Sequence, residues 1–217
     1  MTVRIVLVDS GVHAEHPHVR EHGRVVASST FRGPDERGVV TRDDDAPGTD
    51  ELGHGTAAAE AILDLARGAE IVSLRVFERA PVCPFERVLA ALRHALELDA
   101  RFVNLSLGPP DERWREELER LGAEFAARGI TVVSPAAERG LPMVPGALAD
   151  FTGVLVDARR PRDTPELRAS GARSYWFASP YPRDLPGLAR ARNLAGVSMA
   201  AANVTGFLAR RANDSPT

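Results

Sequence analysis

Short apolar runs alternate with longer amphipathic stretches along most of this 217-residue chain. The runs are rich in valine, isoleucine and leucine, which is typical of strands buried on both faces, and the stretches between them carry apolar residues at helical spacing. This alternation predicts an α/β fold, a three-layer arrangement in which a mostly parallel sheet is flanked by helices. Strands are predicted at residues 3–8, 24–31, 70–77, 101–108, 130–137 and 151–158, and helices at 54–66, 84–98, 111–129 and after residue 198.

Two segments show neither pattern. Residues 32–53 are rich in glycine, proline and aspartate, and residues 159–195 are rich in arginine, proline and glycine, so loops are predicted for most of the first segment and irregular structure for the second. Gly129 follows a long amphipathic stretch and is predicted to end that helix as its C′ residue. No internal repeat, linker or low-complexity tract interrupts the chain, which indicates one domain over residues 1–217.

The composition narrows the classes of partner and chemistry. A net charge of −3 gives no attraction to nucleic acid or anionic membranes, and no apolar run is long enough to span a bilayer. The N-terminus lacks the pattern of a signal peptide, and the single cysteine, Cys83, allows no internal disulfide, so we expect a cytoplasmic protein. All 27 basic residues are arginine, which excludes Schiff-base, Ser–Lys and P-loop lysine chemistry.

Three side chains suited to nucleophilic catalysis stand at the ends of predicted elements. Asp9 follows the first strand, His54 opens a helix within "GHGT", and Ser198 opens the last helix within "GVSMAAANVTG". Because functional residues gather beyond the carboxyl ends of parallel strands, the three side chains could converge. The serine would then attack a carbonyl, the histidine would take and return its proton, and the aspartate would orient the imidazole.

Each of these residues also has a simpler structural interpretation. An aspartate after a strand is often a turn or cap residue, a histidine between glycines can mark a tight turn, and a serine before an alanine run can be an N-cap. The flanking residues favour the joint catalytic interpretation. Gly53 and Gly55 are expected to let the backbone pass close to the histidine. The small residues 57–59 and 200–202 are expected to let both helices be buried, with a helix N-terminus near the developing oxyanion.

Five motifs, in this order along the chain, resemble those of the subtilisin-like serine peptidases. "VDSGV", "GHGT" and "GVSMAAANVTG" hold the aspartate, histidine and serine, "VNLSLG" resembles the strand that pairs with the substrate backbone, and "VVSPAAERG" resembles the oxyanion stretch. The resemblance covers residues 3 to about 208 and implies a subtilisin-like fold that hydrolyses a peptide or protein through an acyl-enzyme, without cofactor or metal. It also implies that six residues wall the substrate pocket: Ser106, Leu107, Gly108, Pro135, Ala136 and Ala137.

Glu138 is the most consequential departure from the family pattern, because the family commonly has an oxyanion-binding asparagine there. An ionised glutamate would repel the oxyanion, whereas a protonated one could donate a hydrogen bond, as an acidic residue does in the related sedolisin peptidases. Alternatively, Arg139 could supply the donor, or Glu138 is a solvated loop residue. Only residues 64–69 link the helix of the histidine to the next strand, so we expect no calcium loop, and we expect neither a propeptide nor the usual C-terminal elements.

Two clusters of possible metal ligands have ordinary interpretations. The stretch "HAEHPHVREH" holds His13, His16, His18 and His22, and imidazole suits Zn²⁺ or Ni²⁺. It resembles the family's loop after the aspartate, however, so we predict a surface loop with incidental histidines and no functional metal site. The acidic residues 43–45 are predicted to be a solvated loop, with weak cation binding as the alternative.

Three functions remain open at this level. The first is a serine endopeptidase of narrow specificity, and the second is a catalytically impaired protein of the same fold that binds a peptide or protein partner. The third, acyl transfer to an amine, ranks last, because no insertion that would shield an acyl-enzyme from water is evident.

Overall fold

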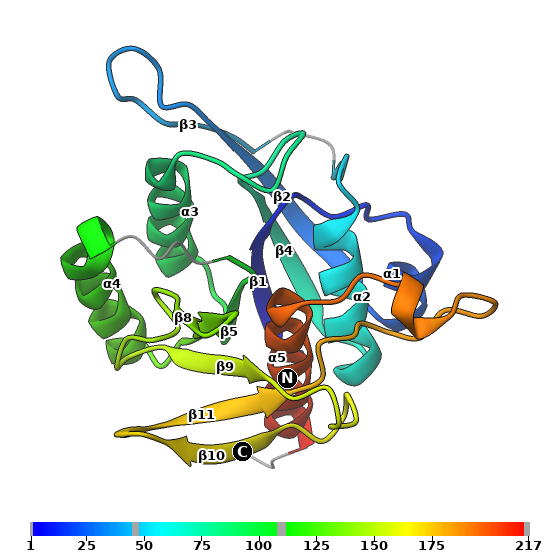
Figure 1. The fold of residues 1–217 in the computed structure, drawn as a ribbon. Helices are drawn as coiled ribbons and strands as arrows, with labels where there is room; N and C mark the ends of the chain where they lie inside the picture. The colour runs from blue at the N-terminus through cyan, green and yellow to red at the C-terminus, as the bar shows by residue number, and fades with distance from the viewer. Residues whose placement is uncertain (1, 45–47, 108–111, 215–217) are drawn as a thin grey trace.

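The computed structural model describes residues 2–44, 48–107 and 112–214 and contains a nine-stranded sheet with helices on both faces (Figure 1). The strand order is β10-β11-β9-β6-β5-β1-β4-β2-β3. All strands from β11 to β2 in this order are parallel, and the edge strands β10 and β3 are antiparallel to their neighbours. The prediction of a mostly parallel α/β sheet is therefore confirmed. The strands are β1 (Arg4–Asp9), β2 (Arg24–Arg32), β3 (Thr41–Asp43), β4 (Glu70–Arg75), β5 (Phe102–Leu105), β6 (Thr131–Pro135), β9 (Thr152–Val156), β10 (Glu166–Ser170) and β11 (Arg173–Ala178).

The sheet separates the apolar core into two main layers, one under each group of helices. Helices α3 (Phe85–Glu97) and α4 (Arg115–Ala127) cover one face of the sheet, and α1 (Pro17–His22), α2 (His54–Leu65) and α5 (Val197–Asp214) cover the other (Figure 1). Strand β1 lies between β4 and β5, and its residues alternate between the two apolar clusters. Because both faces of β1 are covered, the sequence of this strand is apolar almost throughout rather than alternating.

The small residues of α2 and α5 allow these two helices to pack closely. Residues 58, 59 and 200–202 are alanines without solvent exposure. At Gly206 of α5, an added Cβ would lie 2.8 Å from the carbonyl oxygen of Ile62 in α2, so a larger residue would push the helices apart. The expected burial is found at residues 58, 59 and 200–202, whereas Ala57 is half-buried.

Three parts of the chain depart from the predicted elements. Residues 159–195 are not wholly irregular, because they contain the β10–β11 hairpin and a 3₁₀ turn over Arg190–Arg192. The segment 32–53 contributes the short strand β3, and the helix α1 lies between β1 and β2. Strands β3 and β10 are the edge strands of the sheet, and their largely exposed side chains give no continuous apolar run.

Two further short elements are a hairpin after β6 and a 3₁₀ turn before α4. A hairpin of β7 (Ala137–Glu138) and β8 (Leu141–Pro142) follows β6, and its turn residues Arg139 and Gly140 have φ values of 49° and 80°. Positive φ at both central residues is the geometry of a type I′ turn. Helix α4 is preceded by a 3₁₀ turn over Glu112–Trp114 and followed by Arg128 and Gly129. Gly129 has φ 69°, as predicted for a residue that ends a helix.

Candidate active site

The side chains of Asp9, His54 and Ser198 form one continuous hydrogen-bonded chain. Nδ1 of His54 lies 2.8 and 3.0 Å from the two carboxylate oxygens of Asp9, and Nε2 lies 2.9 Å from the hydroxyl oxygen of Ser198. A carboxylate can only accept hydrogen bonds, so Nδ1 carries the proton and Nε2 accepts from the serine hydroxyl. Residues 45 and 144 positions apart are thus brought within proton-transfer distance.

The parallel sheet and two helix starts produce this meeting point. Asp9 is the last residue of β1 and is fully buried, and its Oδ1 also accepts a 2.7 Å hydrogen bond from the backbone N–H of Ser10. His54 begins α2, and Ser198 lies in the first turn of α5. Ser198 is therefore inside the helix rather than preceding it as an N-cap. Its place in the first turn leaves its backbone N–H outside the hydrogen bonds of the helix.

The glycines beside His54 have two different roles. An added Cβ at Gly55 would lie 2.1 Å from the carbonyl oxygen of Gly11 and 3.2 Å from Cβ of Asp9, so only glycine lets α2 approach the loop after β1. Gly53 has open space around it, and its requirement is a φ of 73°, which glycine adopts without strain. The expected close approach is thus found at Gly55 and not at Gly53.

Asp50 is a residue of this site that sequence analysis missed. It lies in the segment predicted as a loop, but its carboxylate fastens the start of α2 to the loop after Asp9. It accepts hydrogen bonds of 2.7–3.1 Å from the hydroxyls of Ser10 and Thr56 and from the backbone N–H groups of Leu52, Gly53 and Thr56. Its position shortly before a helix start was the available signal, because acidic side chains cap helix N-termini.

The electrostatic environment of His54 favours its protonated form. Burial of the imidazole, the largest influence, acts to lower the pKa of His54. The hydrogen bond to Asp9 and the negative charges of Asp9 and Asp50 act in the opposite direction and outweigh it, so the pKa of His54 is raised above its ordinary value of 6.5. The same carboxylates would stabilise an imidazolium that formed during proton transfer from Ser198.

Replacing Asp50 by asparagine is expected to move the acidic limb of the pH profile of kcat/KM to lower pH. A general base must be neutral, so activity falls as the pH drops through the pKa of His54, and the loss of one nearby negative charge lowers that pKa. The pH dependence of kcat/KM for a peptide substrate checks this. Asp99→Asn, at a fully exposed position after α3, removes the same charge far from the site and should leave the limb unchanged. An unmoved limb in Asp50→Asn would contradict the influence of Asp50 on the pKa of His54.

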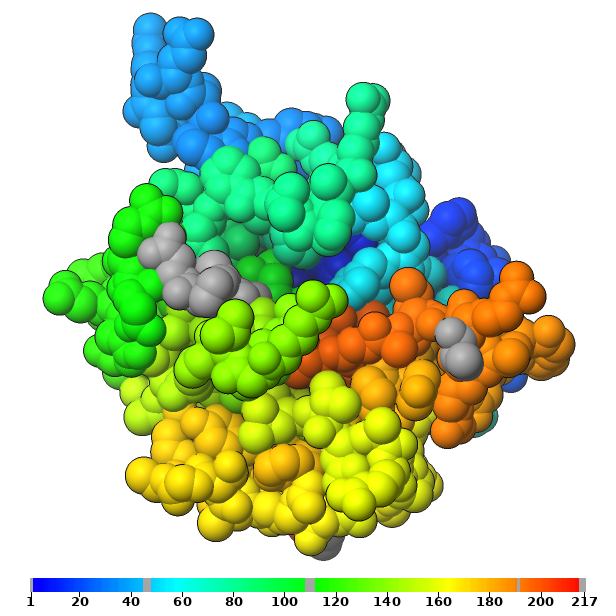
Figure 2. Space-filling model, viewed as in Figure 1, coloured from blue at the N-terminus to red at the C-terminus, as the bar shows by residue number. Residues whose placement is uncertain are grey.

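A largely apolar cavity of about 570 Å³ lies beside His54. Figure 2 shows a hollow between the teal segment near residues 80–90 and the yellow-green segment near residue 140, with the dark blue N-terminal segment at its floor. The apolar lining of the cavity includes Phe77, Val82, Phe85, Leu107, Trp114 and Met143. Cys83 also lines it, and burial raises the pKa of this thiol to about 11, so a thiolate does not compete with Ser198 near neutral pH.

Some of the other predicted site residues line this cavity, and others do not. Ser106 and Leu107 line it, and Ser106 is held by a 2.7 Å hydrogen bond from the amide of Asn104. Pro135 and Ala136 are buried, Ala137 is half-buried, and none of the three lines this cavity, so their predicted role in substrate binding stays a prediction. Gly108 lies outside the described residues.

Glu138 is an exposed residue that lines the same cavity as His54. It ends β7, directly before the type I′ turn, and its backbone pairs with Leu141 of β8. Glu138 therefore borders the region in which a substrate beside His54 would lie. An oxyanion role for Glu138 stays a prediction.

The fold is subtilisin-like, with a mostly parallel sheet flanked by helices. The chain belongs to the subtilase family, whose model matches residues 2–139. No helix within residues 2–44, 48–107 and 112–214 combines the length and the apolarity that crossing a bilayer requires.

The chain is similar to one other subtilisin-like protease in sequence and to one solved structure in fold. The chain is 33% identical over 139 residues to the subtilisin-like protease SBT6.1 of Arabidopsis thaliana, an alignment that covers 61% of this chain and 12% of that protein. It also resembles the crystal structure of a cold adapted subtilisin-like serine proteinase, with a TM-score of 0.67, 18% identity and coverage of 98% of this chain and 76% of that one. The second likeness concerns the fold. The family match ends at residue 139, so one domain over residues 1–217 stays a prediction.

Proposed function

We propose that this chain is a serine endopeptidase that hydrolyses peptide bonds through an acyl-enzyme. The observation that carries the proposal is the hydrogen-bonded chain from Asp9 through His54 to Ser198. In this mechanism Ser198 Oγ attacks the scissile carbonyl while His54 Nε2 takes its proton. His54 then gives that proton to the leaving amine, and Asp9 stabilises the transient imidazolium. Water, deprotonated by His54, releases the acyl group by the reverse sequence.

The cavity beside His54 supports a peptide with an apolar side chain near its scissile bond. Its lining is aromatic and aliphatic, with few polar groups, so burial of an apolar side chain there gains hydrophobic free energy. Two glutamates, Glu86 and Glu138, line the cavity together with one arginine, Arg113, and this excess of acidic groups disfavours an acidic residue there. We therefore propose narrow specificity for substrates that present a large apolar residue.

A fluorophosphonate probe tests the proposed nucleophile directly. Such probes modify activated serine hydroxyls, so the purified chain should be labelled at Ser198, and Ser198→Ala and His54→Ala should remain unlabelled. Ser174→Ala, which changes an exposed serine of β11, is the matched control and should be labelled like the parent. Absence of labelling in folded protein across about pH 4–9 would contradict the proposal.

A second candidate function is peptide binding with little or no turnover. The observation that favours it is Glu138, which lines the cavity beside His54 and stands where the family commonly has an asparagine donor. A negative charge near the developing oxyanion would raise the barrier to acylation, although it would not prevent a peptide from occupying the apolar cavity.

Replacing Glu138 by asparagine is expected to raise kcat by about 10²–10³, the effect of one hydrogen-bond donor in an oxyanion site. The change removes a repulsive charge and supplies an amide N–H in its place. Steady-state hydrolysis of a peptide with a large apolar residue measures the effect. Glu36→Asn, at an exposed position in the segment before β3, should leave kcat unchanged. A fall in kcat for Glu138→Asn would instead identify Glu138 as the oxyanion donor of an active enzyme.

A further inference from the structure

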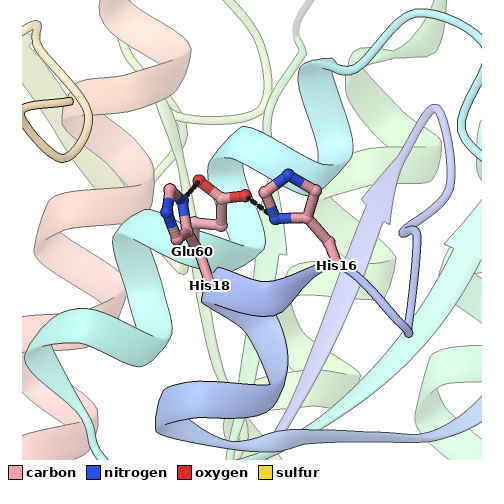
Figure 3. A group of neighbouring side chains, drawn as sticks. All are labelled: His16, His18 and Glu60. Carbon is pink, nitrogen blue, oxygen red and sulfur yellow. Dashed lines mark hydrogen bonds and ion pairs between the residues drawn. The ribbon is translucent and has the colours of Figure 1, made fainter. Parts of the chain in front are cut away.

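A second group of chemically reactive side chains lies between α1 and α2, apart from the hydrogen-bonded chain of Asp9, His54 and Ser198. His16 directly precedes α1, His18 is the second residue of α1, and Glu60 lies midway along α2 (Figure 3). Both imidazole rings face the Glu60 carboxylate, one from each side, and the ring centroids are 5.1 Å apart. His13 is exposed, and buried His22 lies beside Asp64 instead, so neither belongs to this group.

The donor atoms of these three residues are close enough to share one ion. His16 Nδ1 lies 2.6 Å from one oxygen of Glu60, and His18 Nδ1 lies 3.3 Å from the other. All the candidate ligand atoms lie within 4.8 Å of one another. Ligands of a tetrahedral ion with bonds of about 2.1 Å are about 3.4 Å apart, so small rotations of the side chains suffice.

The Glu60 carboxylate is buried without a permanent cationic partner among the described residues. Its side chain is only 10% exposed, and its charged contacts are the two imidazoles. Glu70, another shielded carboxylate, pairs instead with Arg4 and Arg24. Buried charges in proteins are ordinarily paired or coordinate metals, so a metal ion shared with the two imidazoles would give Glu60 a permanent cationic partner.

His16 also has a buried ring nitrogen without a hydrogen-bond partner. Its Nδ1 atom is buried and has no hydrogen-bond partner, although it lies 2.6 Å from a carboxylate oxygen, because the angles do not suit a hydrogen bond. A buried polar atom without a hydrogen-bond partner is unfavourable. A cation placed among the three side chains would satisfy both atoms.

We propose that His16, His18 and Glu60 bind one divalent transition-metal ion of the Zn²⁺ type. Two imidazole nitrogens and one carboxylate suit Zn²⁺, Ni²⁺ or Cu²⁺, whereas Ca²⁺ and Mg²⁺ prefer oxygen ligands alone. Three protein ligands leave one coordination position for water, and the partial exposure of both histidine side chains, 38% and 28%, gives the ion a route from solvent.

A bound metal ion would link two segments that build the proposed active site. The loop that follows Asp9 leads directly to His16, and Glu60 shares α2 with His54. In the same region, Thr56 of α2 already accepts a 3.0 Å hydrogen bond from the backbone N–H of His13. A metal ion bound on one side to α1 and on the other to α2 would stabilise the folded state. This stabilisation does not depend on catalytic activity.

Metal titration of the full chain without an added histidine tag tests this site. We would use the Ser198→Ala background, so that self-cleavage does not interfere, and remove bound metal with a chelator first. Isothermal titration with ZnCl₂ should give one ion per chain. A free Zn²⁺ concentration about 100 times Kd should raise Tm by about 5–10 °C. Bound Co²⁺ should show the visible spectrum of a tetrahedral site.

Matched variants separate this site from unspecific binding to histidine. Glu60→Gln and His18→Gln keep the side-chain size and should each weaken Zn²⁺ binding at least about tenfold. His94→Gln changes a histidine that pairs with Glu97 on α3 and should bind like the parent. No binding by the folded parent, equal binding in Glu60→Gln and His18→Gln, or equal affinity for Ca²⁺ would overturn the proposal. Circular dichroism verifies that each variant is folded.

Discussion

Ser198→Ala is expected to lower kcat for peptide hydrolysis by about 10⁶, the scale known for loss of the nucleophile in subtilisin itself. The change removes the hydroxyl that lies 2.9 Å from His54 Nε2 and leaves the histidine without a nucleophile to deprotonate. The fold should tolerate it, because alanine favours helix more than serine does and residues 200–202 of the same helix are already alanines. Active-site-titrated kinetics on one peptide, compared with Ser174→Ala, measure the loss.

The double variant Ser198→Ala/His54→Ala makes this expectation sharper. Residues that act as one unit are strongly non-additive, so removing His54 after Ser198 should cost little further activity. Independent contributions would instead multiply, and the double variant would then be far less active than either single one. A Ser198→Ala protein that retained activity within tenfold of the parent would show that the nucleophile lies elsewhere.

The centre of the fold was the part most open to sequence-based prediction. Strand β1 is apolar at almost every position because it is covered on both faces, and that burial leaves a continuous run in the sequence. Asp9, His54 and Ser198 could be placed near one another because each lies at an element end that the parallel topology brings to one edge. Their meeting in space follows from the fold, whereas their catalytic role remains our proposal.

The edges and the long-range contacts were less accessible. The strand β10 reads "ELRAS", in which exposed polar side chains conceal the strand, and its hairpin with β11 depends on pairing at the sheet edge. In the sequence Asp50 could not be distinguished from the other acidic residues of its loop, because some of the groups that it binds belong to the segment after β1. Glu60 could not be joined to His16 and His18 by any spacing rule, because their contact depends on how α1 packs against α2.

Asp9→Asn is expected to lower kcat by about 10⁴, the scale known for this change in serine peptidases of another fold. The local contacts of Asp9 explain why so small a change has so large an effect. One of its oxygens accepts the backbone N–H of Ser10 at 2.7 Å. In the variant, the amide oxygen keeps that bond and the NH₂ group replaces the oxygen that lies 3.0 Å from His54 Nδ1. The neutral amide no longer stabilises an imidazolium on His54. When the NH₂ group donates to Nδ1, the ring proton lies on Nε2, which then cannot receive the proton of Ser198.

The thermal stability and KM of Asp9→Asn distinguish a loss of catalysis from a loss of structure. Asparagine is isosteric with aspartate and keeps the Ser10 contact, so Tm of the variant should remain near that of the parent while kcat falls. KM should change little, because Asp9 is fully buried and does not line the cavity beside His54. Asp99→Asn, the same substitution at an exposed position, should leave both constants unchanged. If Asp9→Asn kept kcat within tenfold of the parent, the buried carboxylate would have no part in the reaction, and its contact with His54 would serve the fold alone.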